Sequence, residues 1–173
     1  NIGKSPARFN LKKLQFLSGK HIKNSDDAVL LHDTLKFLTK IRKQDLSEDK
    51  IQILNKSLYC LKDKVKTFSE LIDKAAFILK SRPIKIEPDA RLFIDEEGRE
   101  MLDALTPQLQ NATWTRENLE QVCNSVAESF GVKFGKLASP IRSALSGQTK
   151  TPSVFDMMLI LGRDETIARL ANV

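Results

Sequence analysis

The stretch SDDAVLLHDTLKFLTKI, residues 25–41, contains the clearest structural pattern in the chain. Its apolar residues recur at intervals of three and four, as in Ala28, Leu31, Leu35 and Leu38. This spacing places them on one face of an α-helix. The serine and two aspartates before them are typical of a helix N-terminus, where a side-chain oxygen accepts a hydrogen bond from the first turn. The stretch therefore predicts an amphipathic helix.

The same periodicity recurs on both sides of this stretch, which predicts an all-α fold. One expected helix begins with a capping box, in which Thr67 and Glu70 each accept a hydrogen bond from the backbone N–H of the other. Pro107 is expected to open a short helix of its own. The longer expected helices cover residues 47–61, 67–79, 95–105, 115–130, 134–145, 152–161 and 164–170.

A boundary is expected near residue 85. Ser81-Arg82-Pro83 ends the helical run, because proline disfavours the helical conformation of the residue before it. The sequence therefore predicts two small helical subdomains that join within residues 81–89.

The chain has a formal net charge of +6, which is unevenly distributed. Lys and Arg outnumber Asp and Glu by six to none in residues 1–24, by thirteen to nine in residues 25–85 and by six to three in residues 131–173. Residues 86–130 are acidic, with three basic residues against ten acids. Clusters of Lys and Arg attract phosphate, so a polyanion could bind at both ends of the chain. A lysine-rich solvated surface explains the same pattern.

The sequence lacks the groupings that an enzyme needs. Its seven glycines are scattered singly, so a phosphate-binding glycine loop cannot form. His21 and His32 have no partner at metal-ligand spacing, and no metal site is expected. The acids Asp95-Glu96-Glu97 lie at an expected helix start, where carboxylates favour the positive end of the dipole. An acid–base pair is the weaker interpretation of these acids.

Cysteine use and hydropathy suggest a cytoplasmic protein. Cys60 and Cys123 are isolated among apolar neighbours and are expected to be reduced thiols. No apolar run approaches the roughly 20 residues that a membrane span requires, so no membrane partner is expected. The chain does not begin with methionine, and we expect its start to be a fragment boundary.

Two parts of the chain resemble one protein family. Residues 5–17, SPARFNLKKLQFL, are similar to the segment that follows the catalytic domain and the lysine–serine signature loop of bacterial glutamyl-tRNA synthetases. Residues 135–166 resemble the distal anticodon-binding subdomain of that family through GKLASPIR (135–142), ALSG (144–147), Thr151-Pro152, Phe155 and LGRDET (161–166). The two matches occur in the family's order and cover most of the chain, with residues 82–112 contributing least.

The resemblance implies an anticodon-binding α-helix cage. Residues 25–85 would form its proximal subdomain and residues 86–173 its distal one, with residues 1–24 as the tail of the region that contacts the tRNA stem. The family's glutamate site lies upstream, so this fragment would have no catalytic site and no cofactor. The parent enzyme would be a class I glutamate–tRNA ligase that uses ATP and Mg. The implied partner is glutamate tRNA, or also glutamine tRNA, and a monomer is expected.

The family's anticodon contacts carry over to five positions: Lys64, Arg142, Thr151, Pro152 and Val154. The guanidinium of Arg142 could stack on an unpaired base or bridge a phosphate. Thr151 and Pro152 would form a turn that lines the pocket for the later anticodon bases together with Val154. The local sequence also predicts Thr151 as a helix N-cap and Pro152 as the first helical residue, and both roles can hold together.

Lys64 departs from the family pattern. Many relatives have an arginine at this position, which is associated with the first anticodon base and with the separation of glutamate from glutamine tRNAs. Lysine keeps the charge but lacks the planar fork that binds two acceptors together. We therefore expect relaxed recognition of that base.

Four lysines near the start are expected to contact phosphates without recognising sequence: Lys12, Lys13, Lys20 and Lys23. Trp114 is expected to pack as a hydrophobic staple against Leu119 rather than to stack on a base. Two alternatives to tRNA binding remain open. One is a helical adaptor that binds protein through an exposed apolar face, and the other is a synthetase-derived paralogue that no longer binds tRNA.

Overall fold

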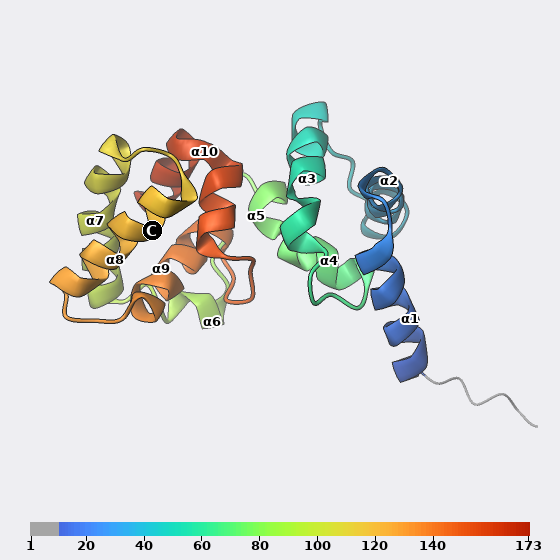
Figure 1. Cartoon of the computed structure of the whole chain (residues 1–173), viewed down its shortest axis with the longest axis horizontal. Helices are drawn as coiled ribbons and strands as arrows, with labels where there is room; N and C mark the ends of the chain where they lie inside the picture. Colours follow the sequence, from blue (N-terminus) through green and yellow to red (C-terminus); the bar gives the residue numbers. More distant parts are fainter. Residues whose placement is uncertain (1–10) are drawn as a thin grey trace, which may run out of the picture.

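Every regular element in the described part of the chain is a helix (Figure 1). The computed structural model describes residues 11–173, with side chains from residue 18 onward. The all-α prediction is confirmed for these residues. The helices are α1 (Leu11–Asn24), α2 (Asp27–Phe37), η1 (Leu38–Arg42), α3 (Glu48–Leu61), α4 (Phe68–Lys74), α5 (Ala76–Leu79), α6 (Pro88–Arg91), α7 (Glu96–Asn111), α8 (Arg116–Ser129), α9 (Phe134–Ser146) and α10 (Val154–Leu170).

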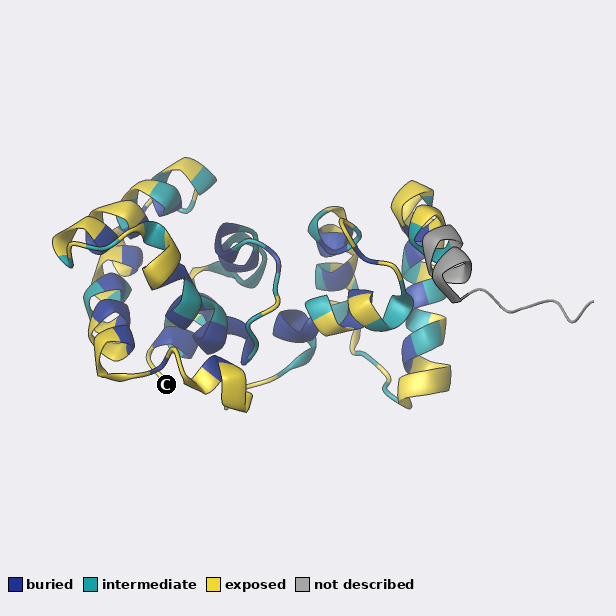
Figure 2. Ribbon diagram, turned by 90° about the horizontal axis from the view of Figure 1, so that it is seen from below, coloured by how far each residue is buried: buried dark blue, intermediate teal, exposed yellow. Residues whose placement is uncertain are grey.

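The helices gather in two groups with α5 between them (Figure 1). Helices α1 to α4 form the group at the right of the figure, and α6 to α10 form the group at the left. Helix α5 packs against α3, α4 and α9, and α10 also contacts α3. Both groups bury apolar side chains and expose their outer faces (Figure 2). None of the helices described is long and apolar enough to cross a bilayer.

Side-chain caps fix several of the predicted helix starts. Asp26 accepts from the Ala28 N–H at 2.9 Å, and Asp95 accepts from the Gly98 N–H at 2.8 Å. Thr67 accepts from the Glu70 N–H at 3.1 Å, as the capping box requires. The Glu70 carboxylate instead accepts from the N–H of Lys66 at 2.7 Å, one residue before the expected donor. The expected capping box is therefore only half correct.

Two expected helix boundaries are wrong. The helix predicted over residues 67–79 breaks at Ala75, whose φ of −77° and ψ of 0° separate α4 from α5. Ala75 is fully buried, so tertiary packing holds this break without glycine or proline. Pro107 does not open a helix but lies inside α7. Leu105 and Leu109 on either side of it are fully buried, and their packing offsets the hydrogen bond that proline removes.

A buried arginine attaches the linking helix α5 to the α6–α10 group. Arg169, in the last turn of α10, is only 4% exposed. Its guanidinium donates to the carbonyl oxygens of Phe77 at 2.7 Å, Leu145 at 2.5 Å and Lys80 at 3.2 Å, and it pairs with Glu165 at 2.7 Å. One side chain thus connects α5 and the residue after it to α9 and α10, and so holds the linking helix against the α6–α10 group.

The Trp114 side chain is held by contacts within the protein. Its indole N–H donates to the carbonyl of Met158 on α10 at 3.3 Å. The Arg163 guanidinium lies over its ring, 5.6 Å from the ring centroid. Because its N–H is bound within the protein and a guanidinium covers the ring, this side chain supports packing between α8 and α10 more readily than base stacking.

Candidate nucleic-acid interface

A pocket of about 550 Å³ lies where the two helix groups meet. The turn after α3 forms one side, and the segment before α10 forms another. The pocket brings Lys64 together with the adjacent residues Thr151 and Pro152, which lie more than half of the chain further along the sequence. The full lining consists of Tyr59, Cys60, Asp63, Lys64, Lys74, Arg116, Thr151, Pro152, Ser153 and Asp156.

The turn that carries Lys64 is held from several directions. Lys64 has a φ of 59°, in the left-handed region that disfavours side chains with a Cβ. The ammonium of Lys74 on α4 donates to the carbonyl of Asp63, directly before it. A Cβ on Gly19 would lie 3.1 Å from the carbonyl oxygen of Val65, so α1 packs closely on the other end of the turn. These contacts hold the strained residue while its side chain stays exposed.

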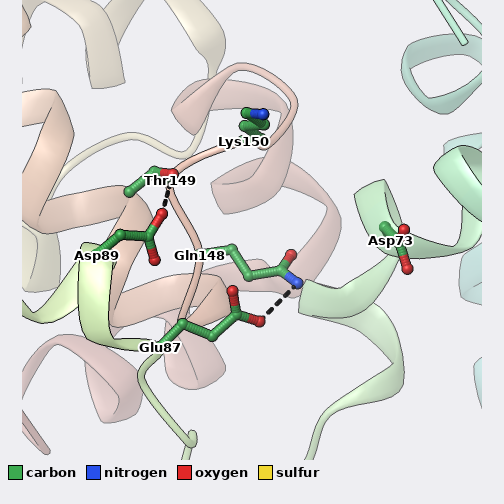
Figure 3. Close-up of a pocket in the computed structure, with 6 residues that line it drawn as sticks. All are labelled: Asp73, Glu87, Asp89, Gln148, Thr149 and Lys150. Carbon is green, nitrogen blue, oxygen red and sulfur yellow. Dashed lines mark hydrogen bonds between the residues drawn. The ribbon is translucent and has the colours of Figure 1, made fainter.

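The first half of the segment between α9 and α10 is held in place by contacts with residues in and before α6. Gly147 has a φ of 73°, and a Cβ there would lie 2.2 Å from the carbonyl oxygen of Lys85. The next two residues bind carboxylates beside α6, with Gln148 donating to Glu87 at 3.1 Å and Thr149 to Asp89 at 2.9 Å (Figure 3). These carboxylates are therefore engaged in holding the segment. Residues 150–153 extend beyond this attachment towards the pocket.

The expected N-cap of the last helix is wrong by two residues. The N-cap of α10 is Ser153 and the helix begins at Val154, so Thr151 and Pro152 lie outside it. The Thr151 hydroxyl donates to the Pro152 carbonyl at 2.9 Å rather than accepting from the first turn. The reason is packing, because Pro152 and Val154 are buried and Phe155 stacks on Phe134 with centroids 5.0 Å apart. Val154 is only 1% exposed and is not among the residues that line the pocket.

A hydrogen-bonded trio crosses the pocket from one helix group to the other. Asp156, in the first turn of α10, accepts from the hydroxyl of Tyr59 on α3 at 3.1 Å. It also pairs with Arg116 at the start of α8. Burial, and then the nearby Asp156 carboxylate, raise the pKa of Tyr59 to about 12. The phenol therefore stays neutral at physiological pH and adds no negative charge to the pocket.

Arg142 lies outside the lining of this pocket. It is half-buried on α9, one turn before Ser146, whose hydroxyl accepts from the Gln148 N–H at 3.1 Å. Arg142 therefore sits near the start of the segment whose far end lines the pocket. Burial lowers the pKa of its guanidinium, and no carboxylate among the described side chains pairs with it. A partly desolvated, uncompensated arginine is a favourable place for a phosphate or a base.

Two of the four lysines predicted to contact phosphate have side chains among the described residues. Lys20 and Lys23 are exposed on α1. The side chains of Lys12 and Lys13 lie outside the described residues. In the described part of the chain, no three His, Cys, Asp or Glu side chains form a group that could hold a metal ion. Cys60 and Cys123 are free thiols.

Seven of the ten pocket residues were not predicted as site residues from the sequence: Tyr59, Cys60, Asp63, Lys74, Arg116, Ser153 and Asp156. Tyr59 could have been found, because it lies beside the apolar stripe of its helix rather than within it, which predicts an exposed aromatic ring. The pairing of Arg116 with Asp156 joins residues 40 positions apart and has no local pattern.

Comparison with a family model gives a match over most of the chain. The model is described as an anticodon binding domain and matches residues 20–173.

Curated relatives match nearly the whole chain. A glutamate–tRNA ligase 2 of Ruegeria pomeroyi is 55% identical over 171 residues, covering 99% of this chain and 36% of the relative. A glutamate–tRNA ligase 2 of Roseobacter denitrificans is 52% identical over 169 residues, covering 98% of this chain and 36% of the relative. The chain thus spans little more than a third of the length of these relatives.

Solved structures share the fold. A crystal structure of a glutamate tRNA ligase from Elizabethkingia meningosepticum, in complex with its amino acid, superposes with a TM-score of 0.75 at 21% identity. The match covers 94% of this chain and 32% of that one. A glutamate-tRNA synthetase from Elizabethkingia anophelis gives a TM-score of 0.70, also at 21% identity, with 94% and 31% coverage. At this identity the likeness establishes the helical fold.

Proposed function

Since the chain belongs to the anticodon binding domain family, we propose that it binds the anticodon arm of a tRNA as part of a glutamate–tRNA ligase. The relatives at 55% and 52% identity support this parent enzyme. ATP, Mg and glutamate would bind in a part of the parent enzyme outside this chain. By fixing the anticodon end, the chain would help to position the acceptor end in that remote site.

The observation that carries the proposal is the meeting of two turns in one pocket. Lys64 comes from the α1–α4 group, whereas Thr151 and Pro152 come from the α6–α10 group. An unpaired loop needs charged and polar groups on a concave surface, which this arrangement supplies. Residues 25–85 and 86–173 would be the proximal and distal subdomains of the cage, with the anticodon held between them.

Arg142 and the lysines extend the surface beyond the pocket. We assign Arg142 to a base or phosphate next to those in the pocket, because its charge is partly desolvated. Val154 would act from below, by setting the backbone of the turn, since its side chain is buried. Lys12, Lys13, Lys20 and Lys23 would contact phosphates towards the stem.

The choice of tRNA would depend on Lys64. Its ammonium is a point charge on a flexible stem, which separates bases less well than a guanidinium fork. The proposal therefore includes relaxed recognition of the first anticodon base, with glutamine tRNA as a second partner. A monomer in the cytoplasm is the expected state of the parent enzyme.

The adaptor alternative has little support. The large apolar side chains exposed among the described residues are few and mostly apart, at Val29, Ile41, Tyr59, Leu92 and Phe93. A docking face for a protein would require a contiguous apolar patch of several hundred Å².

Titration of glutamate tRNA with the chain at several salt concentrations tests the proposal. We expect saturable, salt-dependent binding that Arg142→Ala weakens by tenfold or more, about 1.4 kcal/mol. Arg99→Ala is the matched control, because Arg99 is an exposed arginine on α7 that is not among the residues lining the pocket. Failure to bind tRNA at low salt, or equal losses in the two variants, would refute the proposal.

A further inference from the structure

Tyr59 occupies an unusual position in the pocket. It is the only tyrosine of the chain, and no other aromatic side chain is among the described residues that line the pocket. Its hydroxyl is bound to Asp156 across the pocket, yet 54% of the residue is exposed. The residue is therefore open to a ligand at the pocket, although its hydroxyl is hydrogen-bonded.

The surroundings of this ring favour a nucleic-acid base as its partner. The ring is bordered by the three cations of Lys64, Lys74 and Arg116, which outnumber the two carboxylates of the lining, Asp63 and Asp156. Every base has an apolar face that stacks on an aromatic ring, and each base is attached to an anionic phosphate. An apolar peptide would use the ring but would gain nothing from the three cations.

The ring is also held in place before any ligand arrives. Asp156 accepts from the Tyr59 hydroxyl and pairs with Arg116, which itself pairs with Glu120 at 3.5 Å. A side chain fixed in this way loses little conformational freedom on binding, so more of the stacking energy appears as affinity.

We propose that Tyr59 is a stacking platform for one unpaired anticodon base, beside Lys64. This inference rests on the proposed function and adds a binding residue to it. Stacking makes the contribution of Tyr59 independent of base identity, whereas Lys64 contributes charge. Asp156 and Arg116 are positioning residues, because they act through the ring.

Tyr59 could instead serve only as a tie, a structural residue whose hydroxyl stabilises the packing of α3 against α10 through its hydrogen bond to Asp156. The two roles differ in which atoms they require. Tyr59→Phe keeps the ring and removes the hydroxyl, whereas Tyr59→Leu removes both. A stacking role predicts that phenylalanine is tolerated, and a tie predicts that the two variants lose equally.

The test uses the 173-residue chain and an RNA hairpin with the anticodon stem-loop of glutamate tRNA. We expect Tyr59→Phe to bind within about threefold of the unmodified chain and Tyr59→Leu to bind at least tenfold more weakly, about 1.4 kcal/mol. The slope of log K against log salt should stay unchanged in both, since neither removes a cation. Lys64→Gln is the matched control and should lower that slope by about 0.7, the value for one phosphate of a single strand.

A second readout does not depend on variants that could fold poorly. With one tyrosine in the chain, 3-fluorotyrosine labels this site alone. Stacking places a base over the ring, so we expect its ¹⁹F resonance to move upfield when the hairpin is added.

The possible failures are distinguishable. No binding of the hairpin or of whole tRNA refutes the proposed function. Binding with a stationary ¹⁹F resonance, or with Tyr59→Leu within threefold, overturns the Tyr59 inference alone. Equal losses in Tyr59→Phe and Tyr59→Leu also overturn it and identify a tie. If Tyr59→Leu lowers the thermal midpoint substantially, the resonance of the labelled chain decides.

Discussion

Replacing Arg169 with methionine should destabilise the junction between the two helix groups. Methionine fills the space of the stem but leaves the Phe77, Leu145 and Lys80 carbonyls without their donor and Glu165 without its buried partner. Breaking such a buried arrangement costs roughly 3–5 kcal/mol. For a chain of this size, each kcal/mol lowers the melting temperature by about 2–4 °C. A loss of about 4 kcal/mol therefore predicts a decrease of about 8–16 °C at pH 7.

The assay is thermal and urea denaturation followed by circular dichroism. Arg82→Met is the matched control, since Arg82 pairs with the same Glu165 at 3.1 Å but its side chain is 47% exposed. An exposed pair contributes at most about 1 kcal/mol. We also expect Arg169→Met to weaken tRNA binding, because the pocket is formed by both groups. If its stability stays within 1 kcal/mol of Arg82→Met, the reasoning about the buried guanidinium is refuted.

Three further predictions concern the surface. The affinities of the unmodified chain for glutamate and glutamine tRNA should differ by less than tenfold, about 1.4 kcal/mol, and Lys64→Arg should increase this difference. A tenfold or larger difference in affinity before mutation would contradict the prediction. Replacing both Lys20 and Lys23 with glutamine should reduce the slope of log K against log salt by between about 0.7 and 2 without changing tRNA preference, and an unchanged slope argues against phosphate contacts. Burial raises the pKa of the Cys60 thiol to about 11 from 9.0. At pH 8 its thiolate fraction is therefore roughly a hundredfold below that of an ordinary thiol. Because the thiolate is the species that reacts, the rate of Cys60 alkylation should rise with pH up to about 11. Bound tRNA should slow the alkylation of Cys60, whereas fully buried Cys123 should stay unlabelled with or without tRNA. An alkylation rate of Cys60 that is the same with and without tRNA would indicate that the RNA binds outside the pocket.

The sequence predicts helices well where local chemistry and packing agree. The helix over residues 25–41 is confirmed as α2 and η1, with Asp26 as its cap. Gly162 breaks the last helix as expected, with a φ of 78°. The break at Ala75 and the continuous helix through Pro107 follow from burial of their neighbours, and burial depends on the whole fold rather than on local sequence.

In the candidate site too, some features could be predicted from the sequence and others depend on tertiary packing. The resemblance to a family directed attention to Lys64 and to Thr151-Pro152, and the structure brings these three residues to one pocket. The turn geometry was predicted wrongly, because Thr-Pro is also a good helix start and only the packing of Val154 selects Ser153 as the cap. The Tyr59 hydrogen bond to Asp156 spans 97 positions and arises only when the two helix groups meet.

Photo-crosslinking from the anticodon tests the central claim most directly. Glutamate tRNA carrying 4-thiouridine at each anticodon position in turn would be irradiated with the chain, and the linked peptides identified by mass spectrometry. The account predicts links within residues 59–66 and 150–156, the two sides of the pocket. Links confined to parts of the chain away from the pocket and Arg142, such as the exposed face of α7, would contradict it.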